Sequence, residues 1–358
     1  MIVSHLTEQR LIGDILTALG APFAQGSAQT ASLVEADLRG RASHGLQRLP
    51  LLAQRIGNGV LVPGATPSMD WKSRVVAVAD GGAGFGPWAG LVAMRAAAER
   101  ASRWGIGVVA VKNSNHLGLL APYVEQTAER GLIGVALTTS EALVQPWHGV
   151  AAMVGTNPIA IGIPAGTTPF ILDMATGASS RGQIIDFANR SQNLPDGWAV
   201  DSAGDPTNDP VAALSGAIAP FGGAKGYGLG LGFELIVSAL TSSAVGRDVV
   251  GTLDAVKACN KGDLFICIDP TVFGNADFAL TISEYLDEIR TSASRAGGPA
   301  VRIPGDGARA TRFERMRNGV DIADNVWHEC QELHASLARG ATADPLASGA
   351  IRPSERGQ

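Results

Sequence analysis

Hydrophobic positions recur at helical spacing through the first 56 residues of the chain. Leu11, Ile15 and Leu19 lie four residues apart and share one face of a helix, which Gly20 can end. The same spacing predicts two further helices, at 30–41 and 46–56.

Short apolar, β-branched runs then alternate with helical patterns, which is typical of a mixed α/β fold. The runs predict strands at 74–79, 106–111, 132–138, 159–163, 170–172, 264–268 and 301–303. The helical patterns lie at 87–104, 119–130, 227–240, 278–292 and 312–339. A segment rich in Asp, Asn, Pro and Gly, 189–209, is expected to be a surface excursion. Helical ends therefore flank an α/β middle.

Composition restricts the class of protein. Charged residues make up 17% of the chain and the net charge is −5, with no basic stripe, so nucleic acid is not an expected partner. Three scattered cysteines, Cys259, Cys267 and Cys330, lack the spacing of metal ligands and suggest reduced thiols. No signal peptide and no apolar run long enough to span a membrane are recognisable. We therefore expect a cytoplasmic protein with no metal site and no membrane association.

His116 follows the predicted strand at 106–111 after four polar residues. Loops at strand ends present catalytic groups, and a histidine can donate or accept a proton near neutral pH. A catalytic role and a simple turn-capping role both fit this local pattern.

The segment from Gly84 to Ala89 matches the G-x-G-x-x-A dinucleotide fingerprint between a predicted strand and a predicted helix. A Rossmann unit also needs an acidic residue at the end of the second strand, where this chain has Lys112 and Asn113. The glycines are therefore expected to form a tight turn and not a cofactor site.

A second cluster of reactive side chains lies at 43–48. If this segment is helical, His44 and Arg48 are four residues apart and share a face. A guanidinium can hold a carboxylate through two hydrogen bonds, and a neighbouring histidine could deliver a proton beside it. The alternative is that Ser43 caps a helix and Arg48 is solvated.

Two later segments offer groups that could hold a ribose or a phosphate. The residues at 173–176 follow a predicted strand, so they form either a ligand contact or an ordinary turn. Lys225 lies just before an apolar helix, where a lysine opposes the helix dipole and more plausibly faces a bound anion. Glycines inside that helix indicate close approach of a ligand or of another helix.

Five motifs occur in the order of a known enzyme family. They are S-H-G-x-x-R at 43–48, N-S-N-H-x-G at 113–118, D-M-A-T at 173–176, A-K-G-Y-G-L at 224–229 and R-I-P-G-D at 302–306. Together they resemble the type-2 malate/L-lactate dehydrogenase family, which also contains ureidoglycolate, sulfolactate and diketogulonate enzymes and reductases of cyclic ketimine acids. The resemblance covers nearly the whole chain.

The resemblance implies an NAD- or NADP-dependent oxidoreductase with a non-Rossmann cofactor-binding domain. It also implies an obligate homodimer with the active site near the subunit interface. His116 would donate or accept the proton in hydroxy-acid enzymes, and Arg48 would bind the substrate carboxylate. His44 with Ser43 would be the acid of the ketimine reductases. The implied cofactor contacts are Ser140, Asp173, Met174, Ala175, Thr176, Lys225, Arg302, Pro304, Gly305 and Asp306.

Two positions depart from the family pattern. Gln183 stands where a ketimine reductase relay is expected to have an acid, and the nearest carboxylate is Asp186. His148 stands where the family often has a small residue, which is expected to alter the pocket. The first departure favours an oxo acid over an imine.

The chain is expected to divide into two or three lobes, because 358 residues exceed the roughly 250–300 residues at which a single core usually splits, and the predicted division has three domains. They are a helical domain formed by both termini (1–70 with 308–358), a small α/β domain (71–118 with 281–307) and a cofactor-binding domain (119–280).

The leading hypothesis is reversible hydride transfer between a nicotinamide and C2 of a small 2-oxo or 2-hydroxy acid such as malate or lactate. The first alternative is reduction of a cyclic ketimine acid, pyrroline- or piperideine-2-carboxylate. The second is an inactive dimeric ligand-binding protein, which the retained histidines, Arg48 and Lys225 disfavour. In each case the partner is a small carboxylate.

Overall fold

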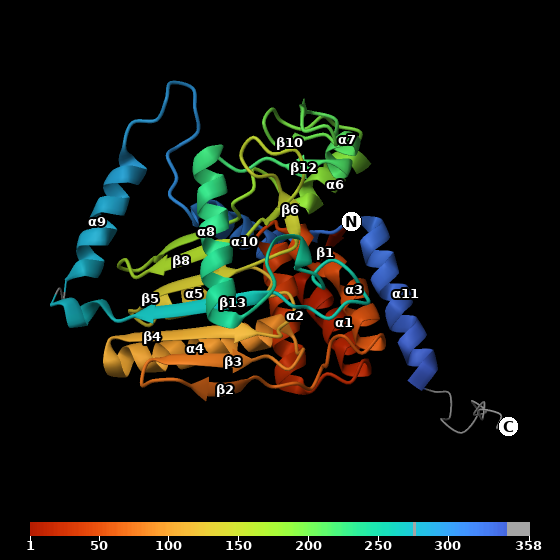
Figure 1. The fold of residues 1–358 in the computed structure, drawn as a ribbon, viewed down its shortest axis with the longest axis horizontal. Helices are drawn as coiled ribbons and strands as arrows, with labels where there is room; N and C mark the ends of the chain where they lie inside the picture. Colours follow the sequence, from red (N-terminus) through yellow and green to blue (C-terminus); the bar gives the residue numbers. More distant parts are fainter. Residues whose placement is uncertain (275–276, 342–358) are drawn as a thin grey trace.

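A seven-stranded sheet runs through the middle of the molecule (Figure 1). The computed structural model describes residues 1–274 and 277–341. The strands lie in the order β2 (Ser68–Trp71), β3 (Val76–Asp80), β4 (Ile106–Lys112), β13 (Gly262–Ile268), β5 (Ile133–Thr138), β8 (Ile159–Ile163) and β9 (Phe170–Met174). In this sheet β3 and β4 are parallel and the other pairings are antiparallel. β13 therefore enters between β4 and β5 from far along the chain.

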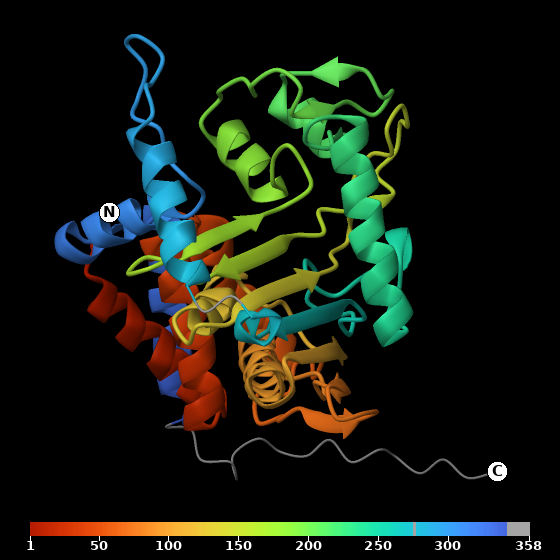
Figure 2. The ribbon, with the colours of Figure 1, turned by 90° about the vertical axis from the view of Figure 1, so that its left-hand side faces the viewer.

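Helices cover both faces of this sheet (Figure 2). Side chains along a strand point alternately to the two faces. Val109 and Val111 of β4 belong to the core beneath α4 (Gly86–Trp104) and α5 (Ala121–Ala128). Ala110 packs instead with Val237 of α8 (Ala224–Thr241) on the opposite face. Because both faces of the sheet are buried here, β4 carries apolar residues on both of its sides.

The two ends of the described chain pack together. α1 (His5–Ala18), α2 (Phe23–Leu38), α3 (Leu49–Gly57) and α11 (Asp324–Ala341) share one buried apolar cluster. Ile12, Leu49 and Trp327 are members of that cluster. β1 (Ile2–Val3) pairs with β14 (Val320–Asp321), which follows α10 (Asp306–Asn318).

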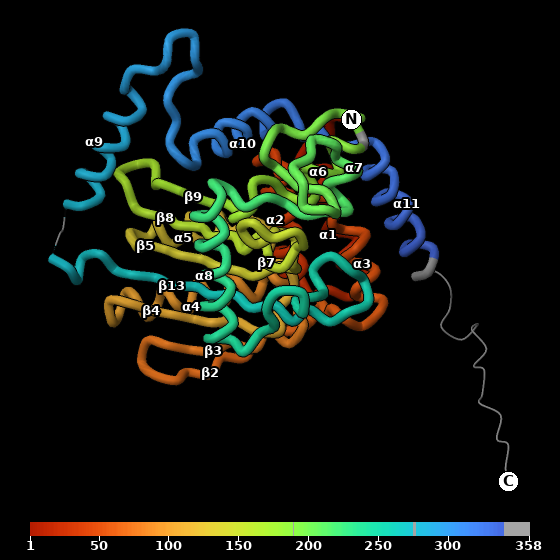
Figure 3. Tube along the Cα trace, turned by 45° about the horizontal axis from the view of Figure 1, so that its top comes forward, coloured from red at the N-terminus to blue at the C-terminus, as the bar shows by residue number. Residues whose placement is uncertain are grey.

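A second, five-stranded sheet carries short helices (Figure 3). Its order is β11 (Pro206–Thr207), β10 (Ala199–Val200), β12 (Ala217–Ile218), β6 (Ala142–Val144) and β7 (Val154–Gly155). α6 (Arg181–Asn189) and α7 (Pro210–Ser215) pack on it around Val144, Ile184 and Ala213. The remaining elements are the 3₁₀ turns η1 (Ala42–His44), η2 (Leu46–Arg48), η3 (Gly246–Asp248) and η4 (Pro270–Phe273), and α9 (Phe278–Thr291).

The prediction of a mixed α/β fold is confirmed. The elements with the strongest local patterns were predicted with accurate bounds. The strand predicted at 159–163 coincides with β8, and the helix predicted at 87–104 differs from α4 by one residue. The three-domain division stays a prediction, and its portion at 342–358 lies outside the described residues. No helix in the described ranges is long and apolar enough to cross a membrane.

Several element predictions were wrong. Residues 301–303 form no strand. The segment 312–339 is mostly helical, as predicted, but it belongs to two helices that are separated at Gly319, whose φ of 91° is left-handed. The segment 189–209 is mostly exposed, as the predicted surface excursion requires, but it also contributes β10 and β11 to the second sheet. α2 begins seven residues before the predicted start at residue 30. A strand of two residues is too short to show a periodic pattern in the sequence, and it forms through its pairing with neighbouring strands.

Candidate functional site

The glycine-rich turn before α4 supports the segment that carries His116. Asn115 donates from Nδ2 to the carbonyls of Ala83, at 2.7 Å, and Gly84, at 2.9 Å. A Cβ at Gly86 would lie 2.2 Å from the His116 carbonyl oxygen. The space beside these glycines is therefore filled by the 113–118 segment.

The turn that carries His44 and Arg48 is held by a buried carboxylate of α2. Asp37 Oδ2 accepts a hydrogen bond from the Leu46 backbone N–H at 2.6 Å. A Cβ at Gly45 would lie 2.0 Å from the same oxygen, so only glycine fits between the two 3₁₀ turns. The chain therefore forms two short turns here, where the sequence suggested one helical turn.

The two histidines meet although their motifs are far apart in the sequence. Their ring centroids are 5.2 Å apart. His116 Nδ1 accepts a hydrogen bond from the Gly118 N–H at 3.0 Å, so the neutral ring carries its proton on Nε2. The His44 Nδ1 lies 3.0 Å from Ser43 Oγ.

Arg48 joins this pair as a half-buried cation. One guanidinium nitrogen, Nη2, lies 3.5 Å from His116 Nε2. The others donate to the carbonyls of Ser43, at 3.0 Å, and Thr252, at 3.1 Å. Glu141 accepts a hydrogen bond from the Thr252 N–H at 2.6 Å and acts on Arg48 only electrostatically, without a hydrogen bond to it. Within the described chain, Arg48 therefore has only neutral hydrogen-bond partners.

The electrostatics of the cluster keep both imidazoles neutral at pH 7. Burial, Arg48 and Arg41 lower the pKa of His44 to about 3. Burial lowers the pKa of His116 well below its ordinary value, and Arg48, His44 and Lys261 lower it further. An anion bound at Arg48 would favour the protonated form of either ring.

The histidines and Arg48 line one small cavity. Its walls also include Gln29, Leu52 and Arg55, and no carboxylate lines it. Arg55 was not singled out from the sequence. Its guanidinium donates to Asn115 Oδ1 at 2.8 Å and to the Lys257 carbonyl at 3.1 Å, so it ties the His116 segment to a distant loop. The sequence did offer a signal for Arg55: it lies seven residues after Arg48, which is about two helical turns and so the same face of a helix.

Two of the predicted cofactor residues meet at Thr156. Ser140 Oγ accepts from the Thr156 N–H at 2.9 Å, and Thr176 Oγ1 donates to the Thr156 carbonyl at 2.9 Å. α8 approaches the same point, because a Cβ at Gly230 would lie 2.6 Å from Thr176 Oγ1. Close packing thus explains Gly230.

Asp173 uses its carboxylate within the fold. It accepts from the N–H groups of Leu120, at 3.0 Å, and Ala121, at 2.8 Å, and so binds the N-terminus of α5. Burial raises the pKa of Asp173, which these backbone donors oppose. Met174 and Ala175 follow it as half-buried residues at the end of β9.

The remaining predicted residues lie at two helix N-termini. Lys225 is exposed in the first turn of α8, where Gly223 provides no side-chain cap. Gly305, with a φ of 94°, precedes α10. Asp306 pairs there with Arg290 at 3.1 Å and with Arg309 at 2.8 Å. Arg302 and Pro304 are exposed in the same loop.

The comparison with known proteins decides the family. The sequence pattern of a family described as malate/L-lactate dehydrogenase matches residues 3–331. The chain belongs to this family.

Its relatives differ in their named substrates. The chain is 38% identical to L-sulfolactate dehydrogenase of Methanocaldococcus jannaschii, over 93% of this chain and 96% of that protein. It is 34% identical to Δ1-pyrroline-2-carboxylate reductase of Ancylobacter novellus, over 90% of this chain and 94% of that protein. A dehydrogenase structure from Sinorhizobium meliloti is 43% identical, with a TM-score of 0.89 and coverage of 93% and 98% of the two chains. The chain is therefore an oxidoreductase.

The structure locates the two residues that depart from the family pattern, Gln183 and His148. Gln183 forms a capping box with Ser180 at the start of α6, where its N–H donates to Ser180 Oγ at 3.2 Å. A Cβ at Gly182 would lie 2.7 Å from Ser43 Cβ, so α6 abuts the histidine cluster. His148 is exposed against Trp147 and is not among the residues that line the cavity.

Proposed function

We propose that the chain transfers hydride between a nicotinamide cofactor, NAD or NADP, and C2 of a small 2-oxo or 2-hydroxy acid. The observation that carries this proposal is the Arg48 guanidinium, a cavity cation 3.5 Å from His116 whose described partners are all neutral. A charge that is partly removed from water is costly unless it is paired, and Arg48 is half-buried, so this site favours an anionic ligand.

Each side chain then has one task. Arg48 binds the substrate carboxylate, which fixes the neighbouring C2 atom beside the histidines. His116 exchanges the proton of the C2 oxygen through Nε2, because Nδ1 is held by the Gly118 N–H. The substrate carboxylate raises the proton affinity of His116, so the ring becomes an acid only in the loaded site. His44 and Ser43 shape the opposite wall.

The cofactor would supply or accept the hydride at its nicotinamide ring. The uncapped N-terminus of α8 and the exposed Lys225 fit an anionic phosphate. Ser140 and Thr176, which meet at Thr156, and the 302–306 loop before α10 would supply further contacts. Asp173 would contribute through its main chain, since its carboxylate binds α5.

A substrate panel tests this assignment. Pyruvate, oxaloacetate and Δ1-pyrroline-2-carboxylate are each assayed with NADH and NADPH by the loss of nicotinamide absorbance. Turnover of an oxo acid is expected. Thermal stabilisation by these acids without any absorbance change would instead identify a ligand-binding protein.

Reduction of a cyclic ketimine acid is the second candidate. The contact of 3.0 Å between Ser43 Oγ and His44 Nδ1 supports it, as does the similarity to a Δ1-pyrroline-2-carboxylate reductase. Gln183 weighs against it, because an amide cannot donate a proton as a carboxylic acid can. Faster turnover of the imine than of both oxo acids would decide for this candidate.

A homodimer is part of the proposal. α8 exposes Leu229, Leu235, Ile236 and Leu240, whose exposed fractions range from 42% to 55%. An apolar helix face of this kind is typical of a subunit interface. Light scattering is expected to give twice the chain mass for the native protein and a lower mass for Ile236→Lys. A native protein of single-chain mass would contradict the dimer.

A further inference from the structure

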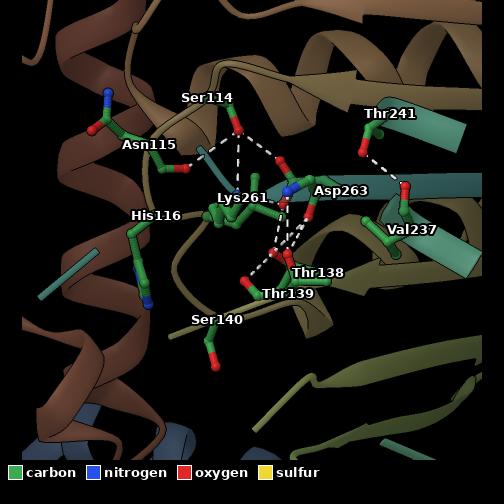
Figure 4. Close-up of polar contacts among 12 residues, drawn as sticks. Ser114, Asn115, His116, Thr138, Thr139, Ser140, Val237, Thr241, Lys261 and Asp263 are labelled. Atoms are coloured by element: carbon green, nitrogen blue, oxygen red, sulfur yellow. Dashed lines mark hydrogen bonds and ion pairs between the residues drawn. The ribbon is translucent and has the colours of Figure 1, made fainter. Parts of the chain in front are cut away.

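A buried ion pair lies behind the segment that carries His116 (Figure 4). Lys261 and Asp263 are 2% and 0% exposed, and Lys261 Nζ donates to an Asp263 carboxylate oxygen. Asp263 also accepts hydrogen bonds from Ser114 Oγ at 2.6 Å and from Thr138 Oγ1 at 2.5 Å. Both oxygens of this carboxylate therefore have donors, which come from three segments of the chain.

The cluster joins neighbouring strand ends. β13 pairs with β4 and β5 so that Asp263 lies opposite Val111 and Thr138. Lys261 directly precedes β13, and its Nζ also donates to Ser114 Oγ at 3.3 Å. Ser114 is two residues before His116, so the cluster anchors the turn from which the imidazole extends (Figure 4).

Stability alone is a weak reason for such a pair. Replacing a buried ion pair with apolar residues of similar volume is often neutral or stabilising, because both charges lose hydration on burial. The cluster also sits beside a group that can change its charge, and the Lys261 ammonium acts electrostatically on that group, His116. Lys261 itself is not among the cavity-lining residues, so it can act without touching a ligand.

We propose that Lys261 is a positioning residue for His116, with Asp263 and Ser114 as its anchors. Its ammonium charge adds to burial, Arg48 and His44 in favouring the neutral imidazole while the cavity is empty, so the ring takes up a proton more readily once an anion reaches Arg48. This inference rests on the proposed function, because it names the residue that influences when His116 is protonated in that reaction.

The charges around His116 come from several elements. Arg48 in η2, His44 in η1 and Lys261 before β13 all lower the pKa of His116. Asp263 partly offsets Lys261, and Arg55 in α3 acts on the adjacent Asn115. Removing the Lys261 charge should therefore raise the pKa of His116, and removing the Asp263 charge should lower it.

An NMR titration of histidine-labelled protein, without cofactor or substrate, tests these opposite shifts. Lys261→Met is expected to raise the midpoint of His116 by about half a pH unit or more, as one nearby charge does. Asp263→Asn is expected to lower it. Glu125→Gln is the control, because it breaks the ion pair with Arg39 at 2.5 Å and neither partner is among the charged groups that lower the pKa of His116, so it should leave the midpoint unchanged.

Equal midpoints in the native protein and Lys261→Met, or shifts of the same sign in both variants, would overturn the proposal. If the midpoint lies below the pH at which the protein stays folded, the imidazolium fraction at the lowest such pH is compared instead. Should Lys261→Met not fold, the double variant with Asp263→Leu must still raise the midpoint. Because no turnover is needed, failure of every substrate would refute the proposed function and leave this test intact.

Discussion

Arg48 is the residue on which the proposed chemistry depends most directly. It lies 3.5 Å from His116, and its other contacts are to main-chain carbonyls. A carboxylate ligand would therefore meet a cation that no acidic side chain of the described structure contacts directly, although Glu141 acts on it electrostatically. Burial is the main reason why both histidines are neutral, and the Arg48 charge lowers the pKa of each ring further.

Arg48→Ala is expected to raise KM by about 10- to 100-fold, since a hydrogen bond to a charged group contributes roughly 1.5–3 kcal/mol. Arg48→Lys should recover only part of this loss, because an ammonium keeps the charge but lacks the planar fork. Steady-state kinetics across substrate concentrations measure both. An unchanged KM in Arg48→Ala would remove the carboxylate role.

His116→Ala is expected to lower kcat by about 10²–10⁴-fold, the usual contribution of a general acid or base. Nicotinamide binding should persist, and fluorescence titration checks it. His44→Ala is the informative companion, because the larger loss identifies the histidine that moves the proton. Full turnover by His116→Ala would exclude His116 as the general acid or base.

At the scale of elements, the turn between α2 and α3 is fixed by one carboxylate. Asp37 binds the Leu46 N–H, and its oxygen fills the space where a Cβ at Gly45 would lie. The histidine and arginine of this turn are thus oriented by a residue that touches neither the cavity nor a ligand.

Gly45→Ala is expected to destabilise the protein by about 1–3 kcal/mol, because the added methyl group forces a shift in a packed region. It should also raise KM, since Arg48 moves with the turn. Gly13→Ala in α1 is the matched control, because nothing lies within 4 Å of its Cβ position. Chemical denaturation and kinetics on both variants check this. Equal stability of the two variants would contradict the role of Asp37 in fixing this turn.

At the scale of the whole molecule, buried titratable groups limit the pH range of stability. Burial and the neighbouring Asp37 raise the pKa of Glu8 well above its ordinary 4.5, so folded Glu8 keeps its proton. The folded state then binds one more proton than the unfolded state above pH 4.5, and stability falls as the pH rises. His44 acts on the other side: its pKa is about 3 in the folded protein and 6.5 ordinarily, so stability falls as the pH drops through that range.

Glu8→Gln is expected to flatten the alkaline decline in stability, which one proton makes about 1.4 kcal/mol per pH unit. Denaturation midpoints between pH 5 and pH 9 would show this. A decline as steep in Glu8→Gln as in the native protein would mean that another group causes it.

The sequence determined those features that a local pattern encodes. Apolar spacing located α4 and β8 almost to the residue, and the five ordered motifs indicated the family. It also singled out His44, Arg48 and His116, because motif spacing identifies residue types that suit one chemistry.

Only the tertiary structure decided how distant residues meet. Arg48 and His116 are 68 positions apart, Arg55 and Asn115 are 60, and Lys261 and Ser114 are 147. β13 brings the last pair together by entering between β4 and β5, which no local periodicity encodes. The reason is physical: helix and strand patterns follow neighbours along the chain, whereas a buried ion pair depends on which strands pack side by side.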